Sequence, residues 1–320
     1  MRKIIAALSL AVVLTACSGA AVTTTAAAPT TTAEPASTTT AAGAYPVTLE
    51  VANGPVLIEA RPEAVVSLSP TATEMLFAIG AGSQVVAVDS LSNYPAEAPV
   101  TDLAAFTPNT EAIAAYRPDL VVTSFDANEL LAGLAELEIP TLLLGAATSI
   151  EDAYTQIEQL GVATDHVAEA SALNAQIASD LEVITSTVTR PSEALSYYYE
   201  LSPDFFSLTS ATFVGQLLGT LGLQNIADPA DADGAAFGYP QLSSEFVVAA
   251  DPDLILLADT KCCGQSAATV AARPGWGEMT AVIGGGVVEL DDDIASRWGP
   301  RVVDLLETVA ARVSELAPAP

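Results

Sequence analysis

The sequence predicts an α/β protein with two Rossmann-like lobes, each built on a parallel-rich sheet, joined by a single long α-helix. Three observations support this prediction. Short continuous apolar runs alternate with stretches of helical periodicity, and such runs are typical of parallel strands covered on both faces. The two halves of the chain contain similar segments in the same order. A long amphipathic stretch at residues 149–190 separates them.

The stretch at 149–190 is the predicted bridging helix. Its apolar residues recur at steps of three and four, which places them on one helix face. They are Val167, Ala170, Leu173, Ile177, Leu181, Ile184 and Val188. Ser149 and Asp152 predict a capping box for a short opening helix, and Asp165 predicts the cap of a longer second one. Residues 166–189 as one helix would span roughly 36 Å, enough to connect two lobes.

The segments on either side of this helix are similar in two places. A strand end rich in hydroxyl residues, followed by a helical run, occurs at 67–80 and again at 207–222. A helix that ends at Pro-Asp before a buried strand occurs at 111–122 and again at 245–256. Two matches in the same order indicate an internal duplication of one α/β unit. The alternative is one large α/β domain with chance similarity.

The predicted N-terminal lobe covers residues 45–148. Asn53 and the following glycine predict a hairpin, and four apolar runs predict buried strands. These runs are 65–68, 85–88, 120–123 and 141–144. Thr71 and Glu74 have the spacing of a capping box, which gives Glu74 a structural role. A helix is expected at 110–116.

The predicted C-terminal lobe covers residues 191–320. Strands are expected at 195–200, 254–257 and 287–290. A helix is expected at 244–250, between the first two of these strands. A last helix is expected to begin near Pro300 and end near Leu316.

The N-terminal residues predict export and lipidation. Two basic residues precede an apolar run at 4–14, which is too short to span a bilayer as a stable anchor. Leu-Thr-Ala-Cys at 14–17 resembles the bacterial lipobox, in which the cysteine, here Cys17, is lipidated. Residues 1–17 are therefore the predicted lipoprotein signal, and the alternative is ordinary secretory cleavage near Ala20. The Thr/Ala/Pro tract at 18–44 lacks large apolar residues and predicts a disordered linker.

Composition excludes several classes of function. The formal charge is −29 with only ten Lys and Arg, so phosphate-mediated binding of nucleic acid is excluded. The chain has a single histidine, His166, which argues against histidine-based metal sites and catalytic triads. The sequence also contains no Gly-x-Ser-x-Gly motif. We expect no catalytic residues, no metal, no cofactor and no enzymatic activity.

Five stretches together resemble one family, the periplasmic binding proteins that deliver vitamin B12 and ferric siderophores to ABC importers. They are VSLSPTATE at 66–74, SNYP at 92–95, RPDLV at 117–121, YPQLS at 239–243 and WG at 276–277. The resemblance covers roughly residues 60–315. It implies two α/β lobes bridged by one helix, with the ligand between the lobes at the carboxyl ends of the strands.

The resemblance also implies ligand contacts. Aromatic positions that line the B12 cleft match Phe106 and Tyr239, and a third match is Tyr199. An acidic and a basic position match Asp293 and Arg297, and Trp298 beside them offers a stacking face. Two further aromatic positions of the family are occupied here by Leu91 and Ser124. The alternatives are packing roles for Phe106 and Tyr239 and, for Arg297, an ion pair with the acidic run 291–293.

Permease docking is the second implication of the resemblance. One glutamate on each lobe of the family docks onto arginines of the permease dimer, and the matching residues are Glu111 and Glu245. Each lies seven residues before its Pro-Asp, in equivalent places of the two halves. The alternative is structural, because a carboxylate in the first turn of a helix interacts favourably with the helix dipole. Both roles are compatible.

Adjacent cysteines at Cys262 and Cys263 follow the strand at 254–257. In an exported protein they are candidates for a vicinal disulfide. A soft-metal site is a second interpretation but lacks ligands. Two reduced, partly buried thiols are the third.

Together these features predict a monomeric, lipid-anchored solute-binding protein on the outer face of the cell membrane. It would carry a corrinoid ligand to an ABC permease dimer. A ferric-siderophore or haem carrier is the alternative within the class, and Tyr199 and Tyr239 are candidate axial ligands for haem. A secreted enzyme on the same fold and a structural or adhesion lipoprotein are the alternatives from other classes.

Overall fold

The structure is a computed structural model that describes residues 45–317, all within one compact unit, Ala42–Pro320. The predicted signal peptide at 1–17, its Cys17 and the linker at 18–44 lie outside the described residues. No helix among residues 45–317 combines the length and the apolar character needed to cross a membrane.

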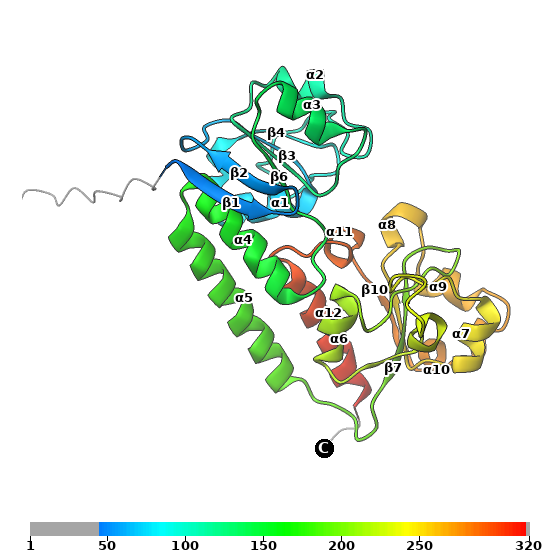
Figure 1. Cartoon of the computed structure of the whole chain (residues 1–320). Helices are drawn as coiled ribbons and strands as arrows, with labels where there is room; N and C mark the ends of the chain where they lie inside the picture. Colours follow the sequence, from blue (N-terminus) through cyan, green and yellow to red (C-terminus); the bar gives the residue numbers. More distant parts are fainter. Residues whose placement is uncertain (1–44, 318–320) are drawn as a thin grey trace, which may run out of the picture. The chain divides into compact units, whose positions relative to one another are not determined.

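The N-terminal lobe is built on a four-stranded parallel sheet in the order β4-β3-β5-β6 (Figure 1). Its strands are β3 (Val65–Leu68), β4 (Val85–Val88), β5 (Leu120–Thr123) and β6 (Thr141–Leu143). An antiparallel hairpin of β1 (Val47–Val51) and β2 (Gly54–Ile58) precedes it, as the Asn-Gly pair predicts. All residues of β3 and β5 are buried, as expected for central strands covered on both faces.

The C-terminal lobe repeats this arrangement in the order β10-β9-β7-β8, again all parallel. Its strands are β7 (Ser196–Glu200), β8 (Gln224–Asn225), β9 (Leu254–Leu257) and β10 (Val287–Glu289). In both lobes the first strand pairs with the second and the third, and the fourth pairs with the third. The two-lobed parallel α/β fold is therefore confirmed, and the shared strand order supports the predicted duplication.

Helices connect the strands of each sheet. Those of the N-terminal lobe are α1 (Pro70–Ala78), α2 (Thr110–Ala114) and α3 (Leu130–Glu136). Those after β7 are α6 (Phe213–Gly219), α7 (Ser244–Ala250), α8 (Thr260–Cys263), α9 (Ala267–Ala271), α10 (Thr280–Ile283), α11 (Asp292–Ala295) and α12 (Val302–Leu316). Short 3-10 turns lie at Ala81–Gln84, Asp228–Asp231 and Trp276–Glu278.

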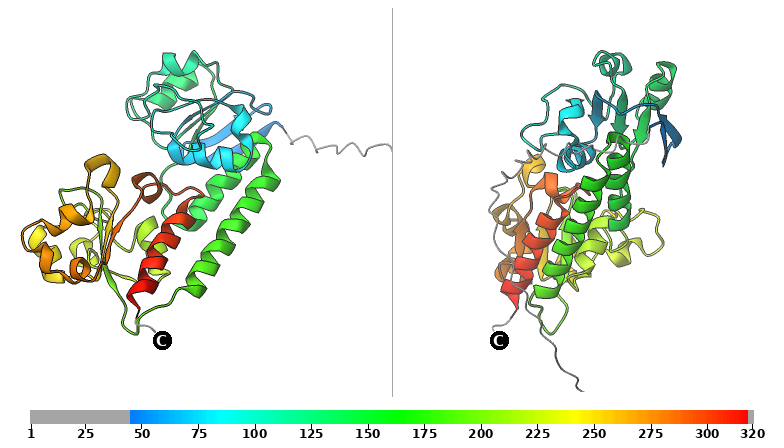
Figure 2. Two further views of the ribbon diagram at one scale, coloured as in Figure 1. Left: turned by 180° about the vertical axis from the view of Figure 1, so that it is seen from behind. Right: turned by 90° about the vertical axis from the view of Figure 1, so that its left-hand side faces the viewer.

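The bridging segment forms two consecutive helices, α4 (Ile150–Thr164) and α5 (Val167–Thr187), which lie alongside each other (Figure 2). The predicted capping box of Ser149 and Asp152 is present at the start of α4. Asp165 ends α4 in the left-handed conformation, with φ of 65°, and does not cap α5 as predicted. Gly161 makes this sharp turn possible, because a Cβ there would lie 2.5 Å from the Cβ of Ala170.

The bridging helix α5 packs against α12, the last helix of the chain (Figure 2). Ile177 of α5 and Leu306 and Val313 of α12 are buried in one apolar core. That core also contains Val65 of β3 and Leu256 of β9. The predicted apolar face of α5 therefore packs into this core, except for Val167, which is 56% exposed.

Candidate functional site

Loops from the carboxyl ends of both sheets contact each other. The loop after β4 contains Asn93, whose side-chain amide donates to the carboxylate of Asp293 in α11, at 3.0 Å. Asp293 follows β10 of the other sheet, so this bond connects the carboxyl ends of the two lobes. In parallel α/β folds this is the side on which ligands bind. The ligand cleft predicted from the sequence is therefore expected on this side of the sheets.

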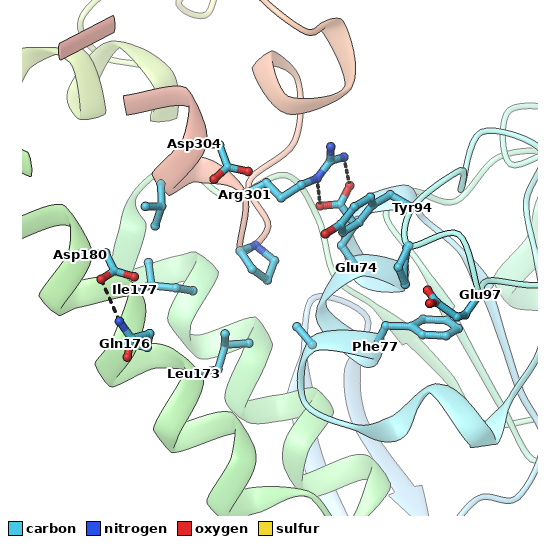
Figure 3. Close-up of a pocket in the computed structure, with 14 residues that line it drawn as sticks. Glu74, Phe77, Tyr94, Glu97, Leu173, Gln176, Ile177, Asp180, Arg301 and Asp304 are labelled. Carbon is cyan, nitrogen blue, oxygen red and sulfur yellow. Dashed lines mark hydrogen bonds and ion pairs between the residues drawn. The ribbon is translucent and has the colours of Figure 1, made fainter. Parts of the chain in front are cut away.

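A buried glutamate links the lobes at this point. Glu74 lies on α1 and is only 2% exposed. Its Oε1 accepts from Nη1 of Arg297 at 2.7 Å, and its Oε2 accepts from Nε of Arg301 at 2.9 Å (Figure 3 shows the Arg301 pair). Both arginines come from the segment between β10 and α12. A carboxylate taken out of water needs such partners, because the loss of its hydration costs several kcal/mol.

The capping role predicted for Glu74 is therefore wrong. The N-cap of α1 is Ser69, whose hydroxyl accepts from the backbone N–H of Ala72, and Thr71 lies inside the helix. The position of Glu74, on the buried side of α1 and opposite the arginines, determines its role.

Arg297 is the most connected of the predicted ligand residues. Besides Glu74, it donates to the side chain of Asn93 at 3.1 Å, to the backbone oxygen of Leu91 at 3.0 Å and to Asp293 at 2.7 Å. The side chain is 8% exposed. The ion pair with the acidic run, the alternative given for Arg297, is present through Asp293. A ligand contact by Arg297 would require some of these bonds to break.

Asp293 also accepts from Nζ of Lys261, at 2.8 Å, and Lys261 pairs with Asp291 at 2.6 Å. Although burial acts to raise the pKa of Asp293, the hydrogen bonds from Lys261 and Asn93 hold it below the usual value. Asp293 is therefore a carboxylate at neutral pH. Its position at the edge between the lobes agrees with the sequence prediction.

Tyr199 and Trp298 belong to the interior. Tyr199 is completely buried in β7, and its hydroxyl donates to the backbone oxygen of Ala295 at 3.0 Å. Its prediction as a ligand residue is wrong for this conformation, because β7 is a central strand covered on both faces. Trp298 is half-buried, packs against the same core and donates through Nε1 to Gln156 at 2.8 Å.

Phe106 and Tyr239 are the exposed aromatics of the predicted set, at 67% and 51% exposure. Phe106 follows β4 and stacks on Phe125, with ring centroids 5.1 Å apart. Tyr239 lies in the loop between β8 and α7. Gly238 beside it has φ of 87°, and a Cβ there would lie 2.7 Å from the side chain of Thr212, so this loop requires glycine. Both aromatics follow the second strand of their lobes.

Glu111 and Glu245 follow these aromatic loops in each lobe. Both are exposed and lie in the first turns of α2 and α7. The two helices are also capped in the same way. The side chain of Asn109 accepts from the backbone N–H three residues later in α2, and the hydroxyl of Ser243 accepts from the backbone N–H three residues later in α7. The duplication therefore places an exposed aromatic and an exposed glutamate in corresponding positions of the two lobes.

Sequence reasoning missed a second buried ionic cluster. Glu200, at the end of β7, is fully buried and receives two hydrogen bonds from Arg273, at 2.6 and 2.5 Å. The guanidinium of Arg273 also lies 4.6 Å from the ring of Trp276. Asp259, after β9, is fully buried, and neither of its carboxyl oxygens has a hydrogen-bonding donor among the described residues. The sequence does contain a signal for Glu200: a carboxylate at the end of a buried strand predicts a buried charge that needs a partner.

Two effects raise the pKa of Asp259 to about 7. Burial is the larger, and the negative charge of Glu200 is the second. The two groups cannot both be ionised cheaply in an apolar environment. Asp259 therefore holds its proton at mildly acidic pH.

Cys262 and Cys263 lie on α8 as free, exposed thiols. The carboxylate of Asp292 accepts from the backbone N–H groups of Lys261 and Cys262 and so fixes the start of this helix. Although this thiol is exposed, partial desolvation, and then the neighbouring Cys263 and Asp292 side chains, raise the pKa of Cys262 to about 12. The vicinal disulfide is not formed in this structure and stays a prediction for oxidised protein. Among residues 45–317, no group of three or more His, Cys, Asp or Glu is arranged to hold a metal ion.

Two α/β lobes of one strand order, joined by a helical bridge and in contact through carboxyl-end loops, define a two-lobed binding protein. The chain belongs to the periplasmic binding protein family, whose pattern matches residues 65–294. Residues 1–18 match the prokaryotic membrane lipoprotein lipid attachment site.

Relatives support the same class. The chain is 31% identical over 280 residues to the uncharacterized ABC transporter substrate-binding lipoprotein YvrC of Bacillus subtilis, covering 84% of this chain and 86% of that protein. It is 28% identical to a cobalamin-binding protein of Halobacterium salinarum, covering 84% and 74%. The vitamin B12-binding protein BtuF of Vibrio cholerae superimposes with a TM-score of 0.65 at 26% identity, covering 80% and 98%. The chain is thus a substrate-binding protein of the ABC-importer type.

Replacing Glu74 tests the link between the lobes. Glu74→Gln removes the carboxylate partner of Arg301 and one of the two carboxylates that pair with Arg297, so we expect the free energy of unfolding to fall by about 3 kcal/mol. Urea unfolding followed by tryptophan fluorescence measures this. The control is Glu97→Gln, an exposed carboxylate, for which we expect a change below about 0.5 kcal/mol. Equal effects of the two variants would contradict the role given to Glu74.

Stability should depend on pH through Asp259. Its proton leaves the unfolded chain near pH 4 but stays on the folded protein up to about pH 7. Stability is therefore lost as the pH rises between these values. Relative to Asp259→Asn, we expect the wild type to lose about 1.4 kcal/mol per pH unit between pH 5 and 7.

Thermal unfolding of both proteins at pH 5, 6, 7 and 8 measures this difference. Asp204→Asn, at an exposed position, is the control and should follow the wild type at every pH. Parallel pH profiles for the wild type and Asp259→Asn would show that Asp259 is ionised throughout this range.

Proposed function

We propose that the protein is anchored by a lipid on Cys17 to the outer face of the cell membrane and captures a corrinoid between its two lobes. The observation that carries this proposal is the pair Phe106 and Tyr239, one exposed aromatic on the carboxyl-end loop of each lobe. Aromatic faces suit a large, flat, partly apolar ligand. The cobalamin-binding and vitamin B12-binding names of the relatives above support the same cargo. No catalytic role is proposed for any residue.

A haem carrier is the second candidate, because the phenol of Tyr239 is accessible and phenolate is a known axial ligand of haem iron. Burial raises the pKa of this phenol, which disfavours the phenolate form that would bind iron. A ferric siderophore is less favoured still. Anionic chelates require free cations, whereas Arg297, Arg301 and Lys261 are all paired with carboxylates.

Delivery is proposed to occur by docking of Glu111 and Glu245 on a permease dimer. Both carboxylates are exposed and occupy equivalent positions of the two lobes, as docking on a two-fold partner requires. Closure of the lobes should be limited, because Glu74, Arg297 and Asn93 already connect them through buried or half-buried bonds. We propose that the protein acts as a monomer.

Equilibrium binding to cyanocobalamin, cobinamide, haem and two ferric siderophores tests the cargo. We expect sub-micromolar binding of a corrinoid, measured by tryptophan quenching and calorimetry. Phe106→Ala and Tyr239→Ala should each weaken it by roughly tenfold through loss of a stacking face. Tyr116→Ala, an aromatic near the end of α2, is the matched control. Tight binding of haem or an iron chelate in place of the corrinoid would replace the cargo while leaving the class unchanged.

Charge reversal tests docking separately from binding. Glu111→Lys and Glu245→Lys should each reduce ATP-dependent corrinoid uptake by about tenfold in proteoliposomes that contain the organism's permease. Corrinoid affinity should stay within about twofold, because neither residue lies in the cleft. Glu307→Lys on α12 is the control. Full uptake by the double variant would reject the docking role of both glutamates.

A further inference from the structure

A cavity of about 480 Å³ lies on the bridging-helix side of the ion pairs between the lobes (Figure 3). Four segments line it: α1, the loop at 94–97, α5 and the start of α12. None of the predicted ligand residues lines this cavity. Glu74 and Arg301 face it, whereas Arg297 extends from Glu74 toward Asn93 and Asp293. The cavity is therefore separate from the proposed corrinoid cleft.

Apolar side chains line much of the cavity. Phe77 of α1, Leu173 and Ile177 of α5 and Val303 of α12 contribute them. Figure 3 shows Leu173 and Ile177 on α5 and Phe77 on α1, with the ring of Phe77 near Glu97. A volume of this size and an apolar lining are typical of sites that bind small organic molecules.

The charges around the cavity are strongly unbalanced. Four carboxylates and one guanidinium line it. The guanidinium of Arg301 is neutralised by Glu74 and covers the ring of Tyr94, 4.2 Å from its centroid. The remaining carboxylates are those of Glu97, Asp180 and Asp304.

These three carboxylates have few partners. Asp180 accepts one hydrogen bond, from Gln176 at 2.8 Å. The side chains of Glu97 and Asp304 accept none from any donor between residues 45 and 317, and they form no ion pair with a side chain there. An apolar cavity with unpaired carboxylates on its rim is complementary to a molecule with an apolar body and a positive charge.

We propose that this cavity is a second binding site, for a small organic cation such as an arylalkyl amine. The apolar body lies against the apolar lining, and the charged group is attracted by the carboxylates of Glu97 and Asp304, which lie at opposite sides of the cavity (Figure 3). An anion is repelled by the same carboxylates, and a neutral molecule gains only the apolar contact. Binding in this cavity depends on its own lining residues and not on which ligand the proposed cleft between the lobes holds.

The occupant of this site contacts both lobes and the bridging helix at once. Phe77 and Glu97 belong to the N-terminal lobe, Leu173 to the bridge and Asp304 to the last helix. A bound cation therefore adds contacts across the same boundary that Glu74 and its arginines connect. Its binding is expected to raise the thermal stability of the protein, with a gain that grows with the logarithm of the ligand concentration once this exceeds the Kd.

Calorimetry on the full-length protein tests the proposal with 2-phenylethylammonium as the probe. The neutral 2-phenylethanol and the anionic phenylacetate are the matched comparisons. We expect saturable binding of the ammonium ion, at least about tenfold tighter than the alcohol, and no binding of phenylacetate. Glu97→Gln and Asp304→Asn should each weaken the ammonium ion roughly three- to fivefold and leave the alcohol unchanged.

Two further variants separate the cavity from the general acidity of the protein. Glu307→Gln removes an exposed carboxylate of α12 that does not line the cavity and should leave the affinity unchanged. Ala78→Trp fills the cavity from the exposed end of α1 and should abolish binding. Equal affinity for the ammonium ion and the alcohol, or undiminished binding by Ala78→Trp, would overturn the proposal. Corrinoid binding measured on the same variants should be unaffected, so the two sites fail or succeed independently.

Discussion

The arrangement of the two halves depends on one buried carboxylate. Glu74 is removed from water on α1, and its charge is compensated only when Arg297 and Arg301 of the other half are in place. Removing a charge from water costs several kcal/mol, so any arrangement of the lobes that withdraws either arginine is strongly disfavoured. The core formed by α5 and α12 brings the halves together without strict direction, whereas the bonds of Glu74 fix their relative orientation.

This use of the arginines limits what the cleft can recognise. Lys261 is paired with Asp291 and Asp293, and Arg297 with Glu74 and Asp293. The cations at the edge between the lobes are thus neutralised by the protein itself, which leaves little positive charge for an anionic chelate. In the function proposed above, recognition then rests on the aromatic faces of Phe106 and Tyr239 and on polar groups such as Asp293. Such a combination would favour a broad, flat ligand over a strongly charged one.

Most of the fold could be predicted because its strands and helices follow from patterns among neighbouring residues in the sequence. The continuous apolar runs of β3, β5 and β9 and the step of three and four in α5 each depend on neighbours within a few residues. The duplication helped as well, because a strand order assigned to one half could be expected in the other. Asp165 shows the limit of such reasoning. Its residue type suits a helix cap and also the left-handed end of a helix, and only the turn at Gly161 decides between them.

Candidate site residues were harder to assign because their roles depend on distant partners. Glu74 and Arg297 are 223 positions apart, and nothing near Glu74 distinguishes a cap from an ion pair between lobes. Tyr199 was misassigned for a related reason, since a tyrosine in a strand is equally plausible at a cleft and in a core. Phe106 and Tyr239 were predicted from the resemblance to the family, and the structure adds that each follows the second strand of its lobe and precedes an exposed glutamate. For Glu111 and Glu245 the duplication itself supplied the long-range information that a single segment lacks.

The ionic cluster also divides the space between the lobes into two chemically different parts. Toward α11, Asp293 and Asn93 are joined to Arg297, so the polar groups there satisfy one another. In the cavity lined by α5, Glu97 and Asp304 have no side-chain partner among residues 45–317, and much of the lining is apolar. With a formal charge of −29, the chain has too few cations to pair every carboxylate, and the sites left unpaired are where a positive ligand gains most. Arg297 and Arg301 are paired with Glu74 across the two halves, so their charges do not compensate the other carboxylates of the cavity.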